Sequence, residues 1–131
     1  MILTTKARYA VMAVTEIACN SNSSPLSLRQ ISISQNISLS YLEQIFVRLR
    51  KENIVTSIKG PGGGYILSRE KHLITISDII KAIDEPIKMT RCSTESKGCM
   101  TSKAKCKTHH LWHGLEKRIY EYLNSISLDQ I

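Results

Sequence analysis

Apolar residues recur at helical spacing near the beginning of the chain. Between residues 6 and 19 they fall three or four positions apart, which predicts an amphipathic helix. They are Ala7, Ala10, Val11, Val14, Ile17 and Ala18. The stretch NSNSSP at 20–25 is predicted to end this helix, because Asn, Ser and Pro favour turns. Cys19 adjoins the apolar stripe, and we expect its thiol to be buried in the core.

The next pattern predicts a short helix. Ser27 and Gln30 form a capping box, in which each side chain accepts a hydrogen bond from the backbone N–H of the other residue. A helix from Leu28 to Gln35 is expected to follow and to bury Leu28 and Ile31.

A second helix is predicted after the polar linker NIS at 36–38. Ser40 and Glu43 form an S-x-x-E pattern and are expected to cap it. Its apolar residues at helical spacing are Leu42, Ile45, Phe46 and Leu49. Its other face presents Tyr41, Gln44 and Arg48. Two short helices joined by a tight polar turn are typical of a helix-turn-helix, whose second helix reads DNA with its N-terminal residues.

A β-hairpin is predicted directly after this helix. The stretch IVTSIKGPGGGYILS at 54–68 contains two β-branched runs on either side of GPGGG. The glycines tolerate positive φ, and Pro61 stiffens the tip. A hairpin in this position is the wing of a winged helix. The glycine run is not a nucleotide-binding loop, because no Gly-Lys-Ser/Thr follows it and it does not open a helix.

Two further helices are predicted toward the C-terminus. Ser77 is expected to cap the first, which carries Ile76, Ile79, Ile80 and Ile83 and ends before Pro86. The second is expected from Leu111, with apolar residues in alternating steps of three and four, which is the pattern of a coiled-coil seam. We expect this seam to be a dimer interface formed by Trp112, Leu115, Ile119, Tyr122 and Ile126.

These patterns predict a mainly α protein with a small β-hairpin wing, namely a winged helix-turn-helix followed by a long C-terminal dimerisation helix. Residues 1–86 would form the winged-helix part, 87–108 a polar loop that carries cysteines, and 109–131 the dimerisation helix and tail, all within one compact domain. A chain of 131 residues with 42% hydrophobic residues is long enough for one such core.

Charge narrows the class of partner. The chain has 18 Lys and Arg against 11 Asp and Glu, for a net charge of +7, which suggests a nucleic acid or an anionic membrane surface. The stretch from Tyr41 to Lys71 contains six Lys or Arg and three Glu, and this local excess of positive charge favours DNA. Neither a signal peptide nor an apolar run of ~20 residues is found in the sequence, so a cytoplasmic protein without a membrane partner is expected.

The predicted reading helix carries side chains suited to bases. Gln44 can pair with adenine and Arg48 with guanine in the major groove, while Lys59 and backbone N–H groups of the wing can position phosphates. Glu43 has two interpretations, a helix cap or a carboxylate that accepts from cytosine N4 or repels an incorrect sequence. The alternative for the whole unit is a winged helix that binds protein rather than DNA.

The segment CSTESKGCMTSKAKCKTH at 92–109 suggests a metal centre. Cys92, Cys99, Cys106 and His109 have the spacing C-x6-C-x6-C-x2-H in a polar stretch with little to bury. Zinc with three Cys and one His is one interpretation. An iron–sulfur cluster is another, and the spacing leaves the two nearly level. Unligated thiols, and His110 or His113 as substitute ligands, remain open. No catalytic set is found in the sequence, so an enzyme is not expected.

At this point four stretches identify a family resemblance. LTTKARYAV, ISLSYLEQIFVRLRKENIV, GPGGGYIL and RC…C…CKTHHLW together resemble the IscR-type iron–sulfur cluster regulators, although the first two Cys gaps are one residue longer than that family's usual pattern. The resemblance implies a dimeric winged-helix transcription factor with a 2Fe–2S cluster held by Cys92, Cys99, Cys106 and His109. It also implies that the segment from Ser38 to Gln44 and the wing contact DNA, and that Glu43 makes site choice depend on the cluster. The expected DNA-contacting residues are Ser38, Ser40, Tyr41, Glu43, Gln44, Arg48, Lys59, Gly60, Pro61, Gly62 and Gly64.

The expected function is that of a homodimeric, cluster-sensing regulator that binds a pseudo-palindromic operator on double-stranded DNA and represses iron–sulfur cluster assembly genes. One alternative is a zinc-stabilised or cluster-free winged-helix protein that binds DNA or protein. Another is a relative within the family that senses nitric oxide or cysteine status.

Overall fold

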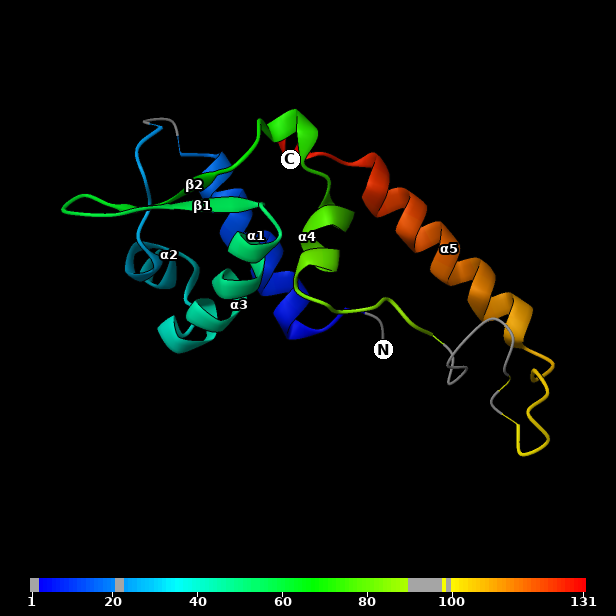
Figure 1. Ribbon diagram of the computed structural model, residues 1–131. Helices are drawn as coiled ribbons and strands as arrows, with labels where there is room; N and C mark the ends of the chain where they lie inside the picture. The colour runs from blue at the N-terminus through cyan, green and yellow to red at the C-terminus, as the bar shows by residue number, and fades with distance from the viewer. Residues whose placement is uncertain (1–2, 21–22, 90–97, 99) are drawn as a thin grey trace.

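Helices α1 to α4 pack with a two-stranded hairpin, and helix α5 runs past the outer side of α4 (Figure 1). The computed structural model describes residues 3–20, 23–89, 98 and 100–131. The elements, in chain order, are α1 (Thr5–Ala18), α2 (Leu28–Gln35), α3 (Leu39–Lys51), β1 (Val55–Ile58), β2 (Gly64–Leu67), the 3-10 turn η1 (Lys71–Leu73), α4 (Ile76–Ala82), α5 (His109–Ser125) and the 3-10 turn η2 (Leu128–Gln130). The helix-turn-helix, the hairpin and the long last helix expected from the sequence are all present.

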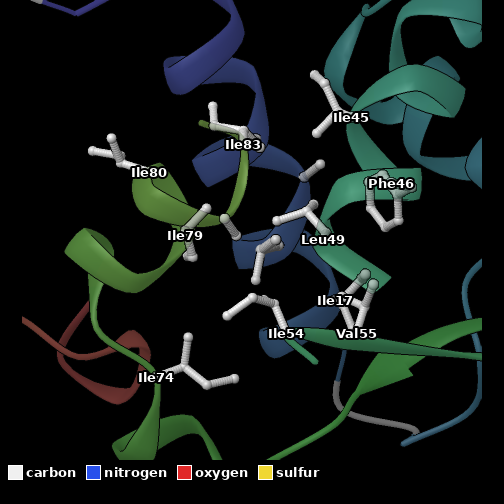
Figure 2. Close-up of a cluster of buried hydrophobic side chains, with 14 of the residues drawn as sticks. Ile17, Ile45, Phe46, Leu49, Ile54, Val55, Ile74, Ile79, Ile80 and Ile83 are labelled. Carbon is white, nitrogen blue, oxygen red and sulfur yellow. The ribbon is translucent and has the colours of Figure 1, made fainter. Parts of the chain in front are cut away.

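One aliphatic core joins the helices to the hairpin. Its side chains point toward one another from several elements, as Figure 2 shows. Phe46 is fully buried among them and meets the ring of Tyr65 edge-on, with 4.8 Å between the ring centroids. Burying one such side chain contributes ~1.5–3 kcal/mol, so this cluster decides how the helices pack. The labelled members are Ile17, Ile45, Phe46, Leu49, Ile54, Val55, Ile74, Ile79, Ile80 and Ile83.

Helix α2 has the bounds and the capping box that the sequence predicted. The N–H of Gln30 donates to Ser27 Oγ over 3.1 Å, and the N–H of Ser27 donates to Gln30 Oε1 over 2.8 Å. The carboxylate of Glu16 on α1 accepts hydrogen bonds from the side chains of Ser34 and Gln35. These contacts hold the first helix of the helix-turn-helix against α1.

The predicted cap of α3 is wrong. The helix begins at Leu39 with Ser38 as its N-cap residue, and the N–H of Leu42 already donates to the Ser38 carbonyl over 3.0 Å. Ser40 therefore lies inside the first turn instead of capping it with Glu43. The physical reason lies in the preceding turn, where Asn36 adopts a left-handed conformation with φ of 53° and Ile37 is buried directly after it. The chain is thereby turned into the helix two residues early.

The hairpin is short and closely packed at one point. Val55 pairs with Leu67 and Ile58 with Gly64. A Cβ on Gly64 would lie 2.3 Å from the Leu26 carbonyl oxygen, so only glycine lets the loop before α2 cross β2 here. Backbone hydrogen bonds between Leu26 and Tyr65 extend the sheet by one bridge. The wing is therefore anchored at its base, and its tip projects away from the helices (Figure 1).

The predicted start of α4 is also wrong by two residues. Thr75 is the N-cap residue and forms a capping box with Asp78, while Ser77 lies buried inside the first turn. Thr75 and Ser77 are the two hydroxyl residues that could cap this helix. The cap at Thr75 is the one that places Ile76 and Ile79 in the core. Ser77 instead donates a hydrogen bond to Asn124 Oδ1 on α5 over 2.7 Å.

Helix α5 differs from the prediction at both ends. It begins at His109, two residues before Leu111, and ends at Ser125. Ile126 is therefore outside the helix, and its carbonyl accepts a hydrogen bond from the N–H of Ile76 over 2.9 Å. Its side chain packs against the protein's own core, which it joins where the chain turns back toward α4. Ile126 is thus not part of the helical seam.

Cys19 is exposed, so the expectation of a buried thiol is wrong. The residue is the C-cap of α1, one position beyond Ala18, which is the last buried residue of the helix. The end of the helix turns the side chain out of the apolar stripe.

Candidate nucleic-acid interface and metal centre

Helix α3 presents one polar face to solvent. Its buried residues are Leu42, Ile45, Phe46 and Leu49. Ser38, Ser40, Glu43 and Gln44 are exposed near its N-terminal end. These residues directly follow the Asn36 turn that joins α2 to α3. The face thus has the place and the polarity of a reading surface in a helix-turn-helix.

Tyr41 and Arg48 do not share this outward face, although the sequence grouped them with Gln44. Tyr41 is half-buried and its ring meets the ring of Tyr9 on α1 edge-on, with 5.6 Å between centroids. The guanidinium of Arg48 lies 3.6 Å from the carboxylate of Asp84, at the end of α4. Both residues occupy the flank of α3 that faces α1 and α4. Helical spacing alone could not separate a flank from an outward face.

Val47 and Lys51 are outward-facing residues that the sequence analysis missed. Val47 has 59% of its surface exposed, and Lys51 is exposed one turn further along. With Ser40 and Gln44 they continue one line of side chains at steps of three and four, and this continuation is the signal that could have found them. The line combines hydrogen-bonding, apolar and cationic side chains, the three kinds that contact base edges and phosphates.

The wing offers a second exposed surface. Lys59, Gly60, Pro61 and Gly62 are exposed around the tip. Gly60 and Gly62 have φ of 96° and 74°, and nothing lies within 4 Å of where their Cβ atoms would be. These two positions therefore favour glycine because of their positive φ, and not because a side chain would lack space. Gly64, by contrast, is half-buried against Leu26, so its glycine serves packing within the protein.

Two of the four expected metal ligands lie at the beginning of α5. The N–H of His109, the first residue of the helix, donates to the Cys106 carbonyl over 3.0 Å. The Cys106 thiol is half-buried and lies 3.5 Å from Thr108 Oγ1, while the His109 side chain is buried. One turn of chain thus brings a thiol and an imidazole to the same end of the helix. Cys92 and Cys99 lie outside the described residues.

The histidines around this turn form a stack. The rings of His109 and His113 are parallel at 5.9 Å between centroids, and His110 meets His109 edge-on at 5.6 Å. Burial is the main cause that lowers the pKa of His109 below its ordinary value, followed by the positive charge of Lys105 and the neighbouring histidines. Glu116 opposes this shift. A lowered pKa favours the neutral imidazole, which is the form that binds a metal.

The donor set at this turn fits the expected group. A thiol and a neutral imidazole suit both zinc and an iron–sulfur cluster. Within 3–20, 23–89, 98 and 100–131, no three metal-ligating side chains of Cys, His, Asp or Glu gather in one place. Cys92 and Cys99, the other two expected ligands, are not among these residues.

Helix α5 exposes apolar side chains along much of its length. Leu111 is 62% exposed, Leu115 38% and Tyr122 65%. Trp112 and Ile119 are half-buried, and the Trp112 indole N–H donates to Thr108 Oγ1 over 3.1 Å. His109 is the sole buried residue of this 17-residue helix. Within the described part of the chain, no helix is both long and apolar enough to span a bilayer.

Comparisons with known proteins agree with this arrangement. The sequence profile of the Rrf2 family, described as iron-dependent transcriptional regulators, matches residues 3–131. The chain is 47% identical over 131 residues to the HTH-type transcriptional regulator IscR of Klebsiella pneumoniae strain 342, covering all of this chain and 79% of the relative. It is equally identical to IscR of Escherichia coli O1:K1, of which it covers 80%.

Solved structures confirm the fold class. T. potens IscR superposes with a TM-score of 0.77 at 33% identity, covering 99% of this chain and 85% of that structure. CymR (YrzC), the global cysteine regulator of B. subtilis, superposes with a TM-score of 0.81 at 32% identity, covering 99% and 95%. These relatives are transcriptional regulators rather than enzymes. The chain therefore belongs to the Rrf2 family of iron-dependent transcriptional regulators.

Proposed function

We propose that this protein is a homodimeric repressor of iron–sulfur cluster assembly genes, and that its preference for DNA sites depends on a 2Fe–2S cluster held by Cys92, Cys99, Cys106 and His109. The observation that carries the proposal is the turn that places Cys106 beside His109 at the start of α5. This turn joins the cysteine segment to the helix that exposes apolar side chains for a partner.

The cluster is supported by the ligand chemistry of that turn. A thiol and an imidazole of lowered pKa are both available there, and the two other cysteines precede them in the same polar segment at equal spacing. When bound, the cluster would make the protein sensitive to the availability of iron and sulfide, because both are needed to assemble it. The side chains of this chain would hold it, and the beginning of α5 would be ordered by it.

The DNA contacts are supported by the two exposed surfaces. Gln44 and Ser40 on the outward face of α3 would read base edges, with Glu43 beside them. Lys59 and the backbone of Gly60, Pro61 and Gly62 would approach phosphates from the wing. Tyr41, Arg48 and Gly64 belong to the expected contact set as well, and each also contacts another part of the protein, at Tyr9, Asp84 and Leu26 respectively.

The dimer is supported by the apolar surface of α5. A single chain leaves Leu111 and Tyr122 more than half exposed, and large apolar side chains gathered on one helix mark an interface. A two-fold dimer would present two copies of α3 to a pseudo-palindromic operator. Residues 1–86 would then read DNA, 87–108 hold the cluster and 109–131 join the copies. Because the DNA of a bacterial cell lies in the cytoplasm, a regulator of this kind would act there.

Anaerobic purification tests the proposal directly. The protein should be red-brown, with iron and acid-labile sulfide near two each per chain, because a 2Fe–2S cluster contains two of each. The same preparation should bind a duplex selected from a random pool more tightly than a scrambled duplex. Stoichiometric zinc with no sulfide would contradict the cluster. It would indicate a zinc-stabilised DNA-binding protein instead.

A second candidate is a cysteine-status sensor. It is favoured by the likeness to CymR, whose structure is described as that of a global cysteine regulator. Measuring the affinity of cluster-free protein for the selected duplex with and without free cysteine distinguishes the two. A cysteine-dependent change in the absence of any cluster would favour this second candidate.

A further inference from the structure

Two acidic residues at the end of α4 are paired with the helices of the DNA-binding part. Asp84 Oδ2 lies 3.6 Å from Nη1 of Arg48 on α3. Oε1 of its neighbour Glu85 lies 4.0 Å from Nζ of Lys6 on α1. We name residues Asp84 and Glu85 the α4 corner. The corner is the last part of the chain before residues 87–108, so it links the cysteine segment to the reading helix.

The local backbone fixes where Asp84 sits. Ile83 is fully buried and anchors the end of α4 in the core. Asp84 then adopts a left-handed conformation with φ of 59°, and its N–H donates to the Lys81 carbonyl over 3.0 Å. Asp and Asn are among the few residues apart from glycine that tolerate this conformation. The backbone at Asp84 is therefore fixed by the end of α4 and not by packing of its own side chain.

The negative charge of Asp84 does not serve α4 itself. A helix C-terminus carries partial negative charge, so a carboxylate there is unfavourable, and Asn or Gly would complete this turn better. The side chain is 87% exposed, so its burial contributes little. The contact with Arg48 is therefore the feature that an aspartate provides at this position and an asparagine would not.

Arg48 lies on the flank of α3, one turn after Gln44. Its side chain is 47% exposed, and its guanidinium is held by a carboxylate instead of pointing along the outward line of Ser40, Gln44 and Val47. An exposed ion pair of this kind contributes little to stability, and another anion can displace it. A DNA phosphate at the edge of the groove is such an anion, and it pairs well with a guanidinium.

We infer that Asp84 restrains Arg48 from DNA, so that the carboxylate and a backbone phosphate compete for one guanidinium. This inference rests on the proposed DNA-binding role of α3. Arg48 is then a conditional phosphate contact and not a base reader.

The test compares the salt dependence of affinity among variants. Fluorescence anisotropy would measure Kd between 50 and 300 mM salt, on a duplex selected by the wild-type protein and on a scrambled duplex. Asp84→Asn keeps the shape and tolerates the left-handed backbone while removing the charge. It should tighten binding to both duplexes several-fold and steepen the slope of log K against log salt by about 0.9, as one added phosphate contact does.

Controls separate competition from a general change in charge. In a protein that carries Arg48→Gln, adding Asp84→Asn should no longer alter the slope of log K against log salt. Glu85→Gln removes the same charge from the adjacent residue, which contacts Lys6, and should not steepen the slope. Thermal unfolding of each variant checks that the fold is retained.

Two outcomes overturn the inference while the proposed function stands. One is an unchanged slope for Asp84→Asn on DNA that the wild-type protein binds normally. The other is an equal effect of Asp84→Asn with and without Arg48. If the wild-type protein binds neither duplex, the proposed function fails first and takes the inference with it.

Discussion

The hydroxyl of Ser77 on α4 donates to the side-chain oxygen of Asn124 on α5 over 2.7 Å, and Ser77 is 2% exposed. Nearby, Lys81 Nζ donates to the Tyr120 hydroxyl over 2.5 Å, so a second contact joins the same two helices. The helix proposed for dimerisation is thus fixed to the DNA-binding part through α4. We expect a change at the start of α5 to reach the reading helix through this junction.

Removing the Ser77 hydroxyl should loosen this junction. Ser77→Ala deletes a buried hydrogen bond, so the free energy of unfolding should fall by ~0.5–1.5 kcal/mol in urea titrations. Ser125→Ala is the control, because that hydroxyl is exposed and bonds only to the nearby Tyr122 carbonyl. Equal effects of the two substitutions would show that the Ser77 contact has no special role.

Cluster ligation can be tested residue by residue. Cys106→Ala and His109→Ala should each abolish visible absorbance and sulfide in anaerobically purified protein, because each removes one donor from the α5 turn. Cys92→Ala and Cys99→Ala should do the same. Cys19→Ala is the matched control, since this cysteine lies exposed at the end of α1 and should leave the colour unchanged. Loss of colour in Cys19→Ala, or its retention in Cys106→Ala, would contradict the ligand assignment.

Base reading and phosphate contact should separate in two variants. Gln44→Ala should relax sequence preference by ~1–3 kcal/mol at one base pair, because a single side chain reads that position. Lys59→Ala should weaken all sequences alike and reduce the salt slope by about 0.9, since we expect the wing lysine to contact phosphate and no base. Affinities for a panel of single-base operator variants provide the measurement. Equal losses on operator and random DNA for Gln44→Ala would argue against base reading.

The dimer should depend on the apolar surface of α5. Ile119→Asp places a charge on that surface and should yield monomers in sedimentation, with operator affinity reduced at least tenfold, because one reading helix remains where two acted together. Lys117→Ala provides the control, as this lysine is exposed and paired with Glu121 at 3.9 Å on the same helix. An Ile119→Asp protein that sediments as a dimer would place the interface elsewhere.

The role of Glu43 should appear as a difference between loaded and cluster-free protein. We expect the cluster-free form to bind a narrower set of sites, because an exposed carboxylate on α3 is tolerated in one orientation of the reading helix and penalised in another. Glu43→Ala should let the cluster-free form bind sites that otherwise require the cluster. Affinities for a panel of selected duplexes, with both forms of both proteins, provide the test. Coincident selectivity of the two forms would leave Glu43 without a discriminating role.

Local signals were sufficient for much of the fold. The Ser27–Gln30 box and the apolar spacing that follows predicted the bounds of α2, because both partners of that box lie within one turn. The glycine run predicted the hairpin for the same reason. The other two caps were misplaced, because each region has two hydroxyl residues two positions apart, Ser38 with Ser40 and Thr75 with Ser77. Burial of Ile37 and of Ile76 chose between them.

The candidate site divides in the same way. The sequence by itself determined the helix-turn-helix, the wing, the polar residues at the start of α3 and the cysteine spacing, since each is a pattern within a few turns of chain. Only the tertiary structure decided that Tyr41 packs on Tyr9, that Arg48 pairs with Asp84 and that Ile126 joins the core. These outcomes depend on elements distant in sequence, because which side of a helix is flank and which is open surface is set by the neighbours that cover it.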